Sequence, residues 1–370
     1  MEIKNNFQGL YVHIPYCIQR CKYCSFYSRT GKIEEDKYLN SLTNHFNFLI
    51  EKFDFVPRFE TLYFGGGTPS LMSLNFFESF LVNLNRFMDI SNFKEITIEA
   101  NPETLTQDYL KGLKGLGVNR ISIGVQSTDD NILKKLNRVH NSKKAVDSVE
   151  LALRYFNNVS VDFIIGIKGQ EEKSVKEIFN FPLLDELKHI SVYMLEGDKN
   201  IHLKADDDFS ALLYKNTIDF LGSKGFYQYE ISNFAKNGFQ SLHNSLYWTG
   251  NNYLGIGVSA HSYKYTKENK KGKRFSELPD YNNFVKSNFK AEVINLEFED
   301  LVKEFFMLGL RMKKGVDRNE FKDKWGVDPF DYFKPVIEKF IEFFIFDGNR
   351  ISLTIDGFLL SNEIFEEIIF

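Results

Sequence analysis

Short apolar runs alternate with longer amphipathic stretches over roughly the first half of the chain. The runs lie at residues 10–14, 61–66, 95–100, 120–125, 159–167 and 189–195. The stretches between them, such as residues 34–53 and 75–88, carry apolar residues three and four positions apart, which is typical of helices. Near-continuous apolar strands that alternate with helices predict a parallel sheet with crossover helices.

The number of these strand–helix units indicates an α/β fold built on a partial (β/α)6 TIM-like barrel. A complete barrel needs eight units, and the alternation fades after residue 195. We therefore assign residues 1–205 to the barrel. Residues 206–224 predict one further helix and residues 226–234 a strand, so residues 206–297 are interpreted as an extension of the core.

The pattern changes again near the C-terminus. Helical stretches are followed by a short hairpin whose turn residues are Asp347 and Gly348, which predicts a small α+β winged-helix-like domain over residues 298–370. Its basic residues are matched by acidic ones, so we expect a lid or docking piece, with DNA binding as the weaker alternative. The lysine-rich residues 264–275 are predicted to form an exposed loop.

Composition narrows the possible partners and the compartment. Lys and Arg number 46 against 50 Asp and Glu, for a net charge of −4, which argues against nucleic acid as a main partner. The first residues lack the pattern of a secretory signal. Charged residues interrupt every long apolar stretch, so no transmembrane segment is expected.

The cysteines are concentrated in one short segment. Cys17, Cys21 and Cys24 are the only three in the 370 residues and have the spacing C-x3-C-x2-C. Three thiolates can each bind one iron of a cubane cluster, which leaves the fourth iron for an external ligand. A structural zinc usually takes four protein ligands, and a disulfide would leave an odd thiol. The segment therefore predicts a [4Fe–4S] cluster, and clustered free thiols favour the reducing cytoplasm.

Polar residues follow the other predicted strands in the same way. The segment Gly65–Pro69 follows the second strand, Glu99 closes the third, Gln126 closes the fourth and Asp162 lies on the fifth. Because ligands of parallel β/α folds bind at the carboxyl ends of the strands, these residues predict a single site at one rim.

The triple glycine at residues 65–67 allows close approach of the backbone to a ligand, and its N–H groups could bind an anion. A phosphate-binding loop is the alternative. It is disfavoured because the G-K-[ST] ending is missing and the segment does not read G-x-G-x-x-G.

The cysteine spacing followed by GGGTP resembles the radical S-adenosylmethionine (SAM) family, in which the methionine part of SAM chelates the open iron. The resemblance is closest to the coproporphyrinogen oxidase-like branch and spans the chain, through YVHIPYC (11–17), GGGTPS (65–70), EANPET (99–104), NRISIGVQS (119–127), NRVH (137–140), VDFIIG (161–166) and HNSLYW (243–248). It implies these SAM contacts: Tyr11, Tyr23, Gly66, Gly67, Thr68, Glu99, Gln126, Arg138 and Asp162.

The residue types agree with the groups that SAM presents. A ribose diol suits carboxylates and amides, adenine suits an aromatic ring, and a carboxylate suits arginine. Each residue alone also has an ordinary alternative. Glu99 or Asp162 could pair with a lysine, and Arg138 could be a solvated helix residue.

Two activities occur in this branch. The oxygen-independent coproporphyrinogen III dehydrogenases carry Gly-Cys-Asn after the third cysteine, whereas here Cys24 is followed by Ser25-Phe26-Tyr27. Residues 243–248 match the HNxxYW segment of the HemW-type haem chaperones. The resemblance therefore implies a chaperone that binds haem, with an unknown haem-acceptor protein and an electron donor for the cluster as partners. It leaves open whether SAM is cleaved or acts as a structural ligand.

Two other classes of function are alternatives. The first is a coproporphyrinogen III dehydrogenase, or another radical SAM enzyme, that acts through a 5′-deoxyadenosyl radical. The second is a redox or metal-storage module without SAM, which would leave the glycine segment, Glu99 and Gln126 unexplained.

His243 is the candidate haem-linked residue. Imidazole is a common axial ligand of haem iron, and Tyr247 and Trp248 could pack on a porphyrin face. The alternative is a polar turn beside core aromatics. The chain also departs from the family pattern. Lys168 stands where proline is usual, and residues 195–203 lack a Gly-Thr-Pro continuation, which puts contacts from those segments in doubt.

Overall fold

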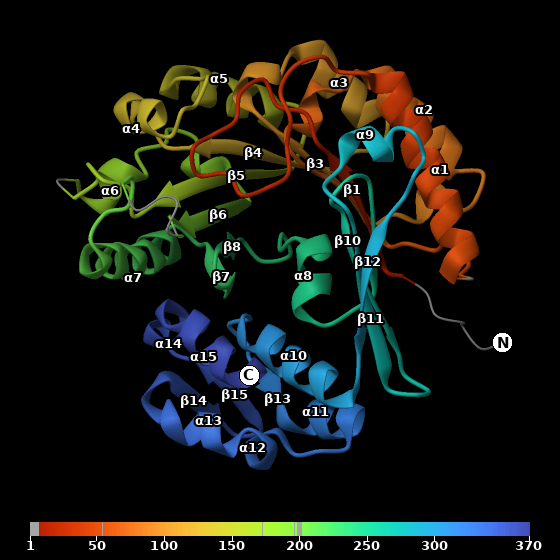
Figure 1. Ribbon diagram of the computed structural model, residues 1–370. Helices are drawn as coiled ribbons and strands as arrows, with labels where there is room; N and C mark the ends of the chain where they lie inside the picture. Colours follow the sequence, from red (N-terminus) through yellow and green to blue (C-terminus); the bar gives the residue numbers. More distant parts are fainter. Residues whose placement is uncertain (1–6, 54, 172, 196, 198–201) are drawn as a thin grey trace.

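A computed structural model of the protein describes residues 7–53, 55–171, 173–195, 197 and 202–370. Six parallel strands follow one another in chain order and form the predicted partial barrel (Figure 1). They are β1 (Gly9–Ile14), β2 (Thr61–Gly66), β3 (Glu95–Ala100), β4 (Arg120–Gln126), β5 (Asn158–Ile165) and β6 (His189–Met194). The predicted fold class is confirmed.

Helices cover the outside of these strands: α1 (Glu35–Phe53), α2 (Leu74–Leu84), α3 (Gln107–Gly115), α4 (Asp130–Lys135), α5 (Ser142–Leu153), α6 (Val175–Ile178) and α7 (Asp207–Ser223). Successive side chains of a strand point to opposite faces. On β4, Ile121 and Ile123 are therefore buried in the core beneath the helices, whereas Ser122 and Gly124 line the interior of the barrel.

The sheet continues past the barrel at both edges. Beyond β1 lie β9 (Tyr253–Ile256), β10 (His261–Thr266), β11 (Lys271–Glu277) and β12 (Ala291–Leu296), and beyond β6 lie β8 (Asn233–Ala235) and β7 (Tyr227–Glu230). The prediction of a loop at residues 264–275 is wrong. These residues form the antiparallel hairpin β10–β11, because Tyr263 and Phe275 are buried and β11 also pairs with β12.

Two short helices occupy the space around these edges. Helix α8 (Leu242–Trp248) contains the HNxxYW segment and lies beside the amino end of β2, between the two ends of the sheet (Figure 1). Helix α9 (Tyr281–Phe284) packs near the cysteine loop, since the hydroxyl groups of Tyr281 and Tyr16 are 2.6 Å apart.

The C-terminal part contains helices around a separate antiparallel sheet of strand order β13-β15-β14. Its elements are α10 (Phe298–Leu310), β13 (Val316–Asp317), α11 (Arg318–Trp325), α12 (Pro329–Tyr332), α13 (Lys334–Lys339), β14 (Phe344–Asp347), β15 (Arg350–Leu353), α14 (Ile355–Leu359) and α15 (Ser361–Ile369). The predicted hairpin turn is present, with Gly348 at a positive φ of 57°.

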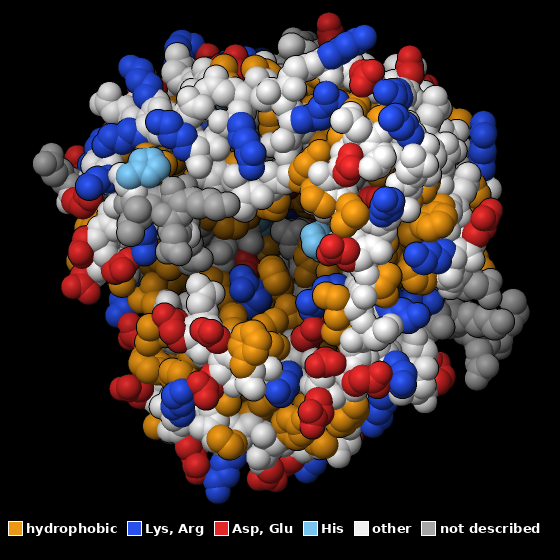
Figure 2. All heavy atoms as spheres, in the orientation of Figure 1, with side chains coloured by type: hydrophobic (Ala, Val, Ile, Leu, Met, Phe, Trp, Pro, Cys, Tyr) orange, Lys and Arg blue, Asp and Glu red, His pale blue; other side chains and the backbone are white. Residues whose placement is uncertain are grey.

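Backbone hydrogen bonds join this C-terminal part to the barrel. Ile231 donates to the carbonyl of Arg311 (3.1 Å), and Lys313 donates to that of Tyr229 (3.0 Å). On the face shown in Figure 2, acidic and basic side chains are interspersed over the C-terminal part. Across the described ranges, no helix combines the length and apolar character needed to cross a membrane.

Candidate functional site

A cavity of about 340 Å³ opens at the carboxyl ends of the barrel strands. The site residues predicted from the sequence that line it are Cys17, Cys21, Tyr23, Cys24, Gly66, Gly67, Thr68, Glu99, Gln126, Arg138 and Asp162. They come from loops and strands separated by up to about 145 positions of the chain, so the barrel brings them together.

The cysteine loop is folded back on the end of β1. Cys17 donates its N–H to the carbonyl of Arg29 (2.9 Å), and Arg29 donates to that of Pro15 (2.6 Å). The Arg29 guanidinium lies 3.9 Å from the centre of the Tyr281 ring on α9. A cation–π contact from a distant helix thus fixes the base of the loop.

The three thiols are unpaired and half-buried. Burial raises the pKa of the Cys17 and Cys24 thiols, so both hold their protons at neutral pH until a metal displaces them. Arg138 donates to the sulfur of Cys21 (3.2 Å), and Thr68 donates to that of Cys17 (3.7 Å). These donors would stabilise the thiolate form that iron requires.

The glycine segment packs directly against the cysteine loop. A Cβ atom on Gly67 would lie 2.6 Å from the carbonyl oxygen of Tyr16, and one on Gly66 would lie 2.6 Å from the ring of His13. Gly66 also has a φ of 115°, which glycine adopts readily. Both positions therefore require glycine because of close approach.

The anion-binding role of the glycine N–H groups stays a prediction, and protein atoms accept from three N–H groups of the segment. Gly66 donates to the Glu99 carboxylate (3.1 Å), Gly67 to the carbonyl of Ile14 (2.8 Å) and Thr68 to that of Tyr16 (2.7 Å). The segment holds the cysteine loop and Glu99 in place.

Arg138 projects from the turn after α4 into the cavity. It donates to Asn101 Oδ1 (2.7 Å) and to the carbonyl of Gly124 (3.0 Å). The side chain is half-buried and lines the cavity, so its guanidinium offers a positive charge to a ligand there.

Two carboxylates form the wall of the cavity. Glu99 accepts from the hydroxyl of Tyr63 (2.8 Å), and burial raises its pKa to about 7. Asp162 accepts from Ser122 (3.1 Å), and burial likewise raises its pKa. Gln126 lies beside them at a positive φ of 67°, which is unusual for a residue other than glycine and occurs where a site constrains the backbone.

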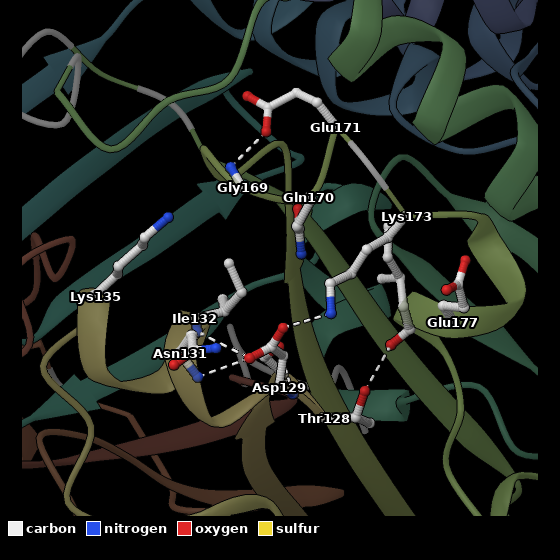
Figure 3. A network of polar contacts seen from close by, with 12 residues as sticks. Thr128, Asp129, Asn131, Ile132, Lys135, Gly169, Gln170, Glu171, Lys173 and Glu177 are labelled. Carbon is white, nitrogen blue, oxygen red and sulfur yellow. Dashed lines mark hydrogen bonds and ion pairs between the residues drawn. The ribbon is translucent and has the colours of Figure 1, made fainter.

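A polar network holds the loop after β5 against the helix that precedes Arg138 (Figure 3). Asp129 caps α4 through the N–H of Asn131 (2.7 Å) and forms an ion pair with Lys173 (2.5 Å). From the same helix, Lys135 donates to the carbonyl of Lys168 (2.7 Å). The N–H of Lys168 donates to Leu203 (2.8 Å), a bond that the proline usual at this position could not make.

Tyr11 and His243 are the predicted site residues that do not line the cavity. Tyr11 lies lower in the barrel, and its hydroxyl is 3.1 Å from His13 Nδ1. His243 is 0% exposed at the opposite end of the strands, 2.7 Å from Thr61 Oγ1 and 2.8 Å from the Tyr247 hydroxyl. Burial lowers its pKa to about 3, so the ring is neutral.

Several residues at the site were missed from the sequence. Asn101 orients Arg138 and donates to Thr68 (2.9 Å), and Tyr193 of β6 lines the cavity. Both follow the signal used for the others, since each lies at or just beyond the end of a predicted strand. Glu95 and His189 lie at the amino ends of β3 and β6, away from the cavity, and no motif in the sequence indicates them.

Comparison with known proteins defines the class. Residues 11–181 match the Radical SAM superfamily, and residues 296–360 match the HemN C-terminal domain. The solved structure of coproporphyrinogen III oxidase (HemN) from Escherichia coli superposes with a TM-score of 0.81 over 98% of this chain and 90% of that chain. At 19% identity this likeness shows the fold alone.

Two curated relatives narrow the class. Heme chaperone HemW from Lactococcus lactis is 33% identical, covering 97% of this chain and 96% of its own, and HemW from Bacillus subtilis is 33% identical, covering 97% and 98%. The chain therefore belongs to the HemW family of radical SAM proteins, which confirms the resemblance found in its sequence.

Membership of this superfamily implies SAM and an iron–sulfur cluster, and the cavity fits both. Among the residues that the structure describes, no three His, Cys, Asp or Glu side chains form a ligand set for one metal ion. A cluster does not need such a set, because each cysteine binds a different iron. The guanidinium of Arg138 and the two wall carboxylates suit the charged and hydroxyl groups of SAM.

Proposed function

We propose that this protein is a haem chaperone that binds haem and delivers it to an acceptor protein. The observation that carries the proposal is the full-length similarity to two proteins named heme chaperone HemW, in a chain that keeps the HNxxYW segment on α8. Cytoplasmic location, an acceptor protein and an electron donor for the cluster belong to the same proposal.

In this proposal Cys17, Cys21 and Cys24 hold a [4Fe–4S] cluster, and SAM occupies the cavity beside them. When bound, the cluster would supply an electron to SAM or use SAM as a ligand that controls cluster integrity. Glu99 and Asp162 would accept from the ribose hydroxyls, and Arg138 would donate to a carboxylate. Tyr23, Gln126 and the segment 66–68 would complete the wall.

Haem contact at His243 remains a prediction that requires movement of the ring. Both ring nitrogens lie within hydrogen-bond distance of protein hydroxyls, so an iron would have to replace one of them. We expect His243→Ala to weaken haem binding at least tenfold and to spare the cluster, because one strong ligand bond is lost. Visible absorption spectra of the haem complex measure this.

The matched control is Thr61→Val, which removes one ring partner and keeps the imidazole. It should retain haem binding if His243 is the ligand. Equal haem affinity in the wild type and in His243→Ala would assign the iron to another residue and leave α8 as a structural element.

The experiment that tests the function is an anaerobic assay of reconstituted protein with SAM and a reductant. One sample receives haem and the other coproporphyrinogen III. We expect stable haem binding and no decarboxylation of the porphyrinogen. Formation of protoporphyrinogen would instead assign the protein as a coproporphyrinogen III dehydrogenase, and would show that the residues after Cys24 do not discriminate the two activities.

A further inference from the structure

A single buried tyrosine contacts both the cavity and the HNxxYW helix. The hydroxyl of Tyr63 donates to Glu99 Oε1 (2.8 Å) at the cavity wall. The ring of the same tyrosine stacks on His243, with centroids 5.0 Å apart and planes at 27°. His243 in turn contacts the hydroxyl of Tyr247 (2.8 Å). The predicted SAM contact and the HNxxYW segment are thus two steps apart through Tyr63.

The α8 end of this series of contacts, at His243, is fixed to the barrel. Glu95 of β3 accepts from the N–H groups of Leu242 (2.9 Å) and His243 (3.0 Å), and Thr61 of β2 lies 2.7 Å from the His243 ring. Because Glu95 and His243 are 3% and 0% exposed, α8 cannot shift without breaking buried hydrogen bonds or moving the ring against Tyr63.

The cavity end of this series of contacts, at Tyr63, depends on whether Glu99 is ionised. The groups that face its carboxylate come from β1, β2, β4, β5, β6 and α8, and are Tyr11, Tyr63, Arg120, Asp162, Tyr193 and Tyr247. Burial raises the pKa of Glu99 to about 7, and the hydrogen bond from Tyr63 opposes this rise. Tyr63 therefore favours the ionised form that would bind ribose hydroxyls.

We propose that Tyr63 is a positioning residue that couples Glu99 to the HNxxYW helix, so that SAM binding in the cavity and the arrangement of α8 depend on each other. This inference rests on the proposed SAM site. Coupling between two sites is reciprocal, so whatever displaces His243 also changes the affinity for SAM.

The test compares Tyr63→Phe, which keeps the stacked ring and removes the hydroxyl, with the wild type. Tyr109→Phe is the matched control, because it removes a part-buried hydroxyl of α3 that donates to the carbonyl of Met72 (2.9 Å) in the segment before α2. SAM affinity is measured by anaerobic titration from pH 6 to pH 9, and α8 is followed by fluorescence of Trp248. A Trp325→Phe background removes the only other tryptophan.

We expect the wild type to change its Trp248 emission on SAM binding. Tyr63→Phe should weaken SAM binding about tenfold or more at pH 7, the effect of losing one hydrogen bond to a charged group. It should also move the midpoint of the pH dependence upward and lose most of the emission change, whereas Tyr109→Phe should match the wild type in all three respects.

Two outcomes overturn the proposal in distinguishable ways. Tyr63→Phe with wild-type affinity, pH midpoint and emission change would remove the coupling and leave the SAM site intact. Failure of the reconstituted wild type to bind SAM would remove the proposed site itself, and the coupling with it.

Discussion

The two ends of the barrel lumen differ in how their acidic side chains are paired, although buried Arg120 at the amino end keeps Nε and Nη1 without a hydrogen-bond partner among the described residues. At the carboxyl end the three thiols are half-buried and outside any disulfide, with donors from Arg138 to Cys21 and from Thr68 to Cys17. At the amino end α8 closes the lumen, where Glu95 accepts two backbone N–H groups and His243 contacts a hydroxyl at each ring nitrogen.

This difference separates groups that await a ligand from groups that hold the scaffold. Burial raises the pKa of both Glu99 and Asp162, so the cavity carboxylates lack enough protein donors or cations to offset their desolvation. Glu95 is as deeply placed but faces the first turn of α8 and lies near Arg120. Buried carboxylates of one barrel thus have two different roles. Glu99 and Asp162 line the cavity, whereas Glu95 holds α8.

Loss of one cysteine thiol should abolish both cluster binding and SAM binding at the carboxyl end of the barrel. We expect Cys21→Ala to abolish the visible absorbance of the reconstituted cluster and, with it, SAM binding, because the remaining two thiols cannot hold a cubane. Absorption spectra and SAM titration measure the two effects. Thr30→Ala, an exposed change in the same loop, is the control, and retention of both properties by Cys21→Ala would refute the ligation.

Removal of Glu95 should produce the largest effect on stability at the closed end. Glu95→Ala leaves the N–H groups of Leu242 and His243 without their acceptor and removes one of the two carboxylates near buried Arg120, so we expect a loss of about 3–5 kcal/mol in the free energy of unfolding. Denaturant unfolding measures it. The control is Glu60→Ala, whose exposed ion pair with Lys94 should contribute about 0–1 kcal/mol.

If Glu95→Ala lowered the free energy of unfolding by only about 0–1 kcal/mol, as expected for Glu60→Ala, α8 would not be fixed to the barrel through the Glu95 carboxylate.

The Glu99 carboxylate at the carboxyl end should make the stability of the protein depend on pH. The pKa of Glu99 is raised to about 7 from its usual 4.5, so its proton stabilises the folded state below pH 4.5 and this contribution is lost as pH rises through 7. Glutamine cannot titrate. Relative to wild type, Glu99→Gln should therefore become more stable by about 2–3 kcal/mol between pH 5 and pH 8, while it weakens SAM binding.

Melting temperatures across this range measure the trend, and Glu103→Gln at an exposed position is the control. A difference between Glu99→Gln and wild type that stayed constant with pH would show that Glu99 does not titrate there.

The sequence predicted the barrel and most of the open end because both follow local rules. Strand periodicity gave the six parallel strands, and the carboxyl end of each strand located Glu99, Gln126 and Asp162. The rule that ligands bind at the carboxyl ends of strands predicts which end of the barrel a residue faces, but not how far along the strand it lies. Tyr11 points into the lumen as expected, yet it lies below the cavity because it is in the middle of β1 and not at its end.

The closed end could not be predicted because its contacts join residues distant in the chain. Glu95 and His243 are 148 positions apart, and Thr61 and His243 are 182 apart. Neither pair has a spacing that a sequence pattern can reveal. The prediction of a loop at residues 264–275 is wrong for a related reason. Pairing of β11 with β12 outweighs the loop-like composition of these lysine-rich residues.

The departure from the family pattern at Lys168 allows the smallest test. The N–H of Lys168 donates to Leu203, and Ala205 donates back to Gly166 (2.9 Å), so the loop beside the cavity is paired with the segment that leads into α7. Lys168→Pro removes the first bond, and we expect a loss of about 1 kcal/mol in the free energy of unfolding.

Lys168→Ala keeps the N–H and should stay within about 0.5 kcal/mol of wild type, because the side chain is exposed. Denaturant unfolding of both variants measures the difference. If proline were tolerated as well as alanine, this hydrogen bond would contribute nothing, and the loop would be held to α4 by the Asp129–Lys173 ion pair and by Lys135. A loss confined to Lys168→Pro would instead show that this chain replaces the rigidity of a proline with a hydrogen bond.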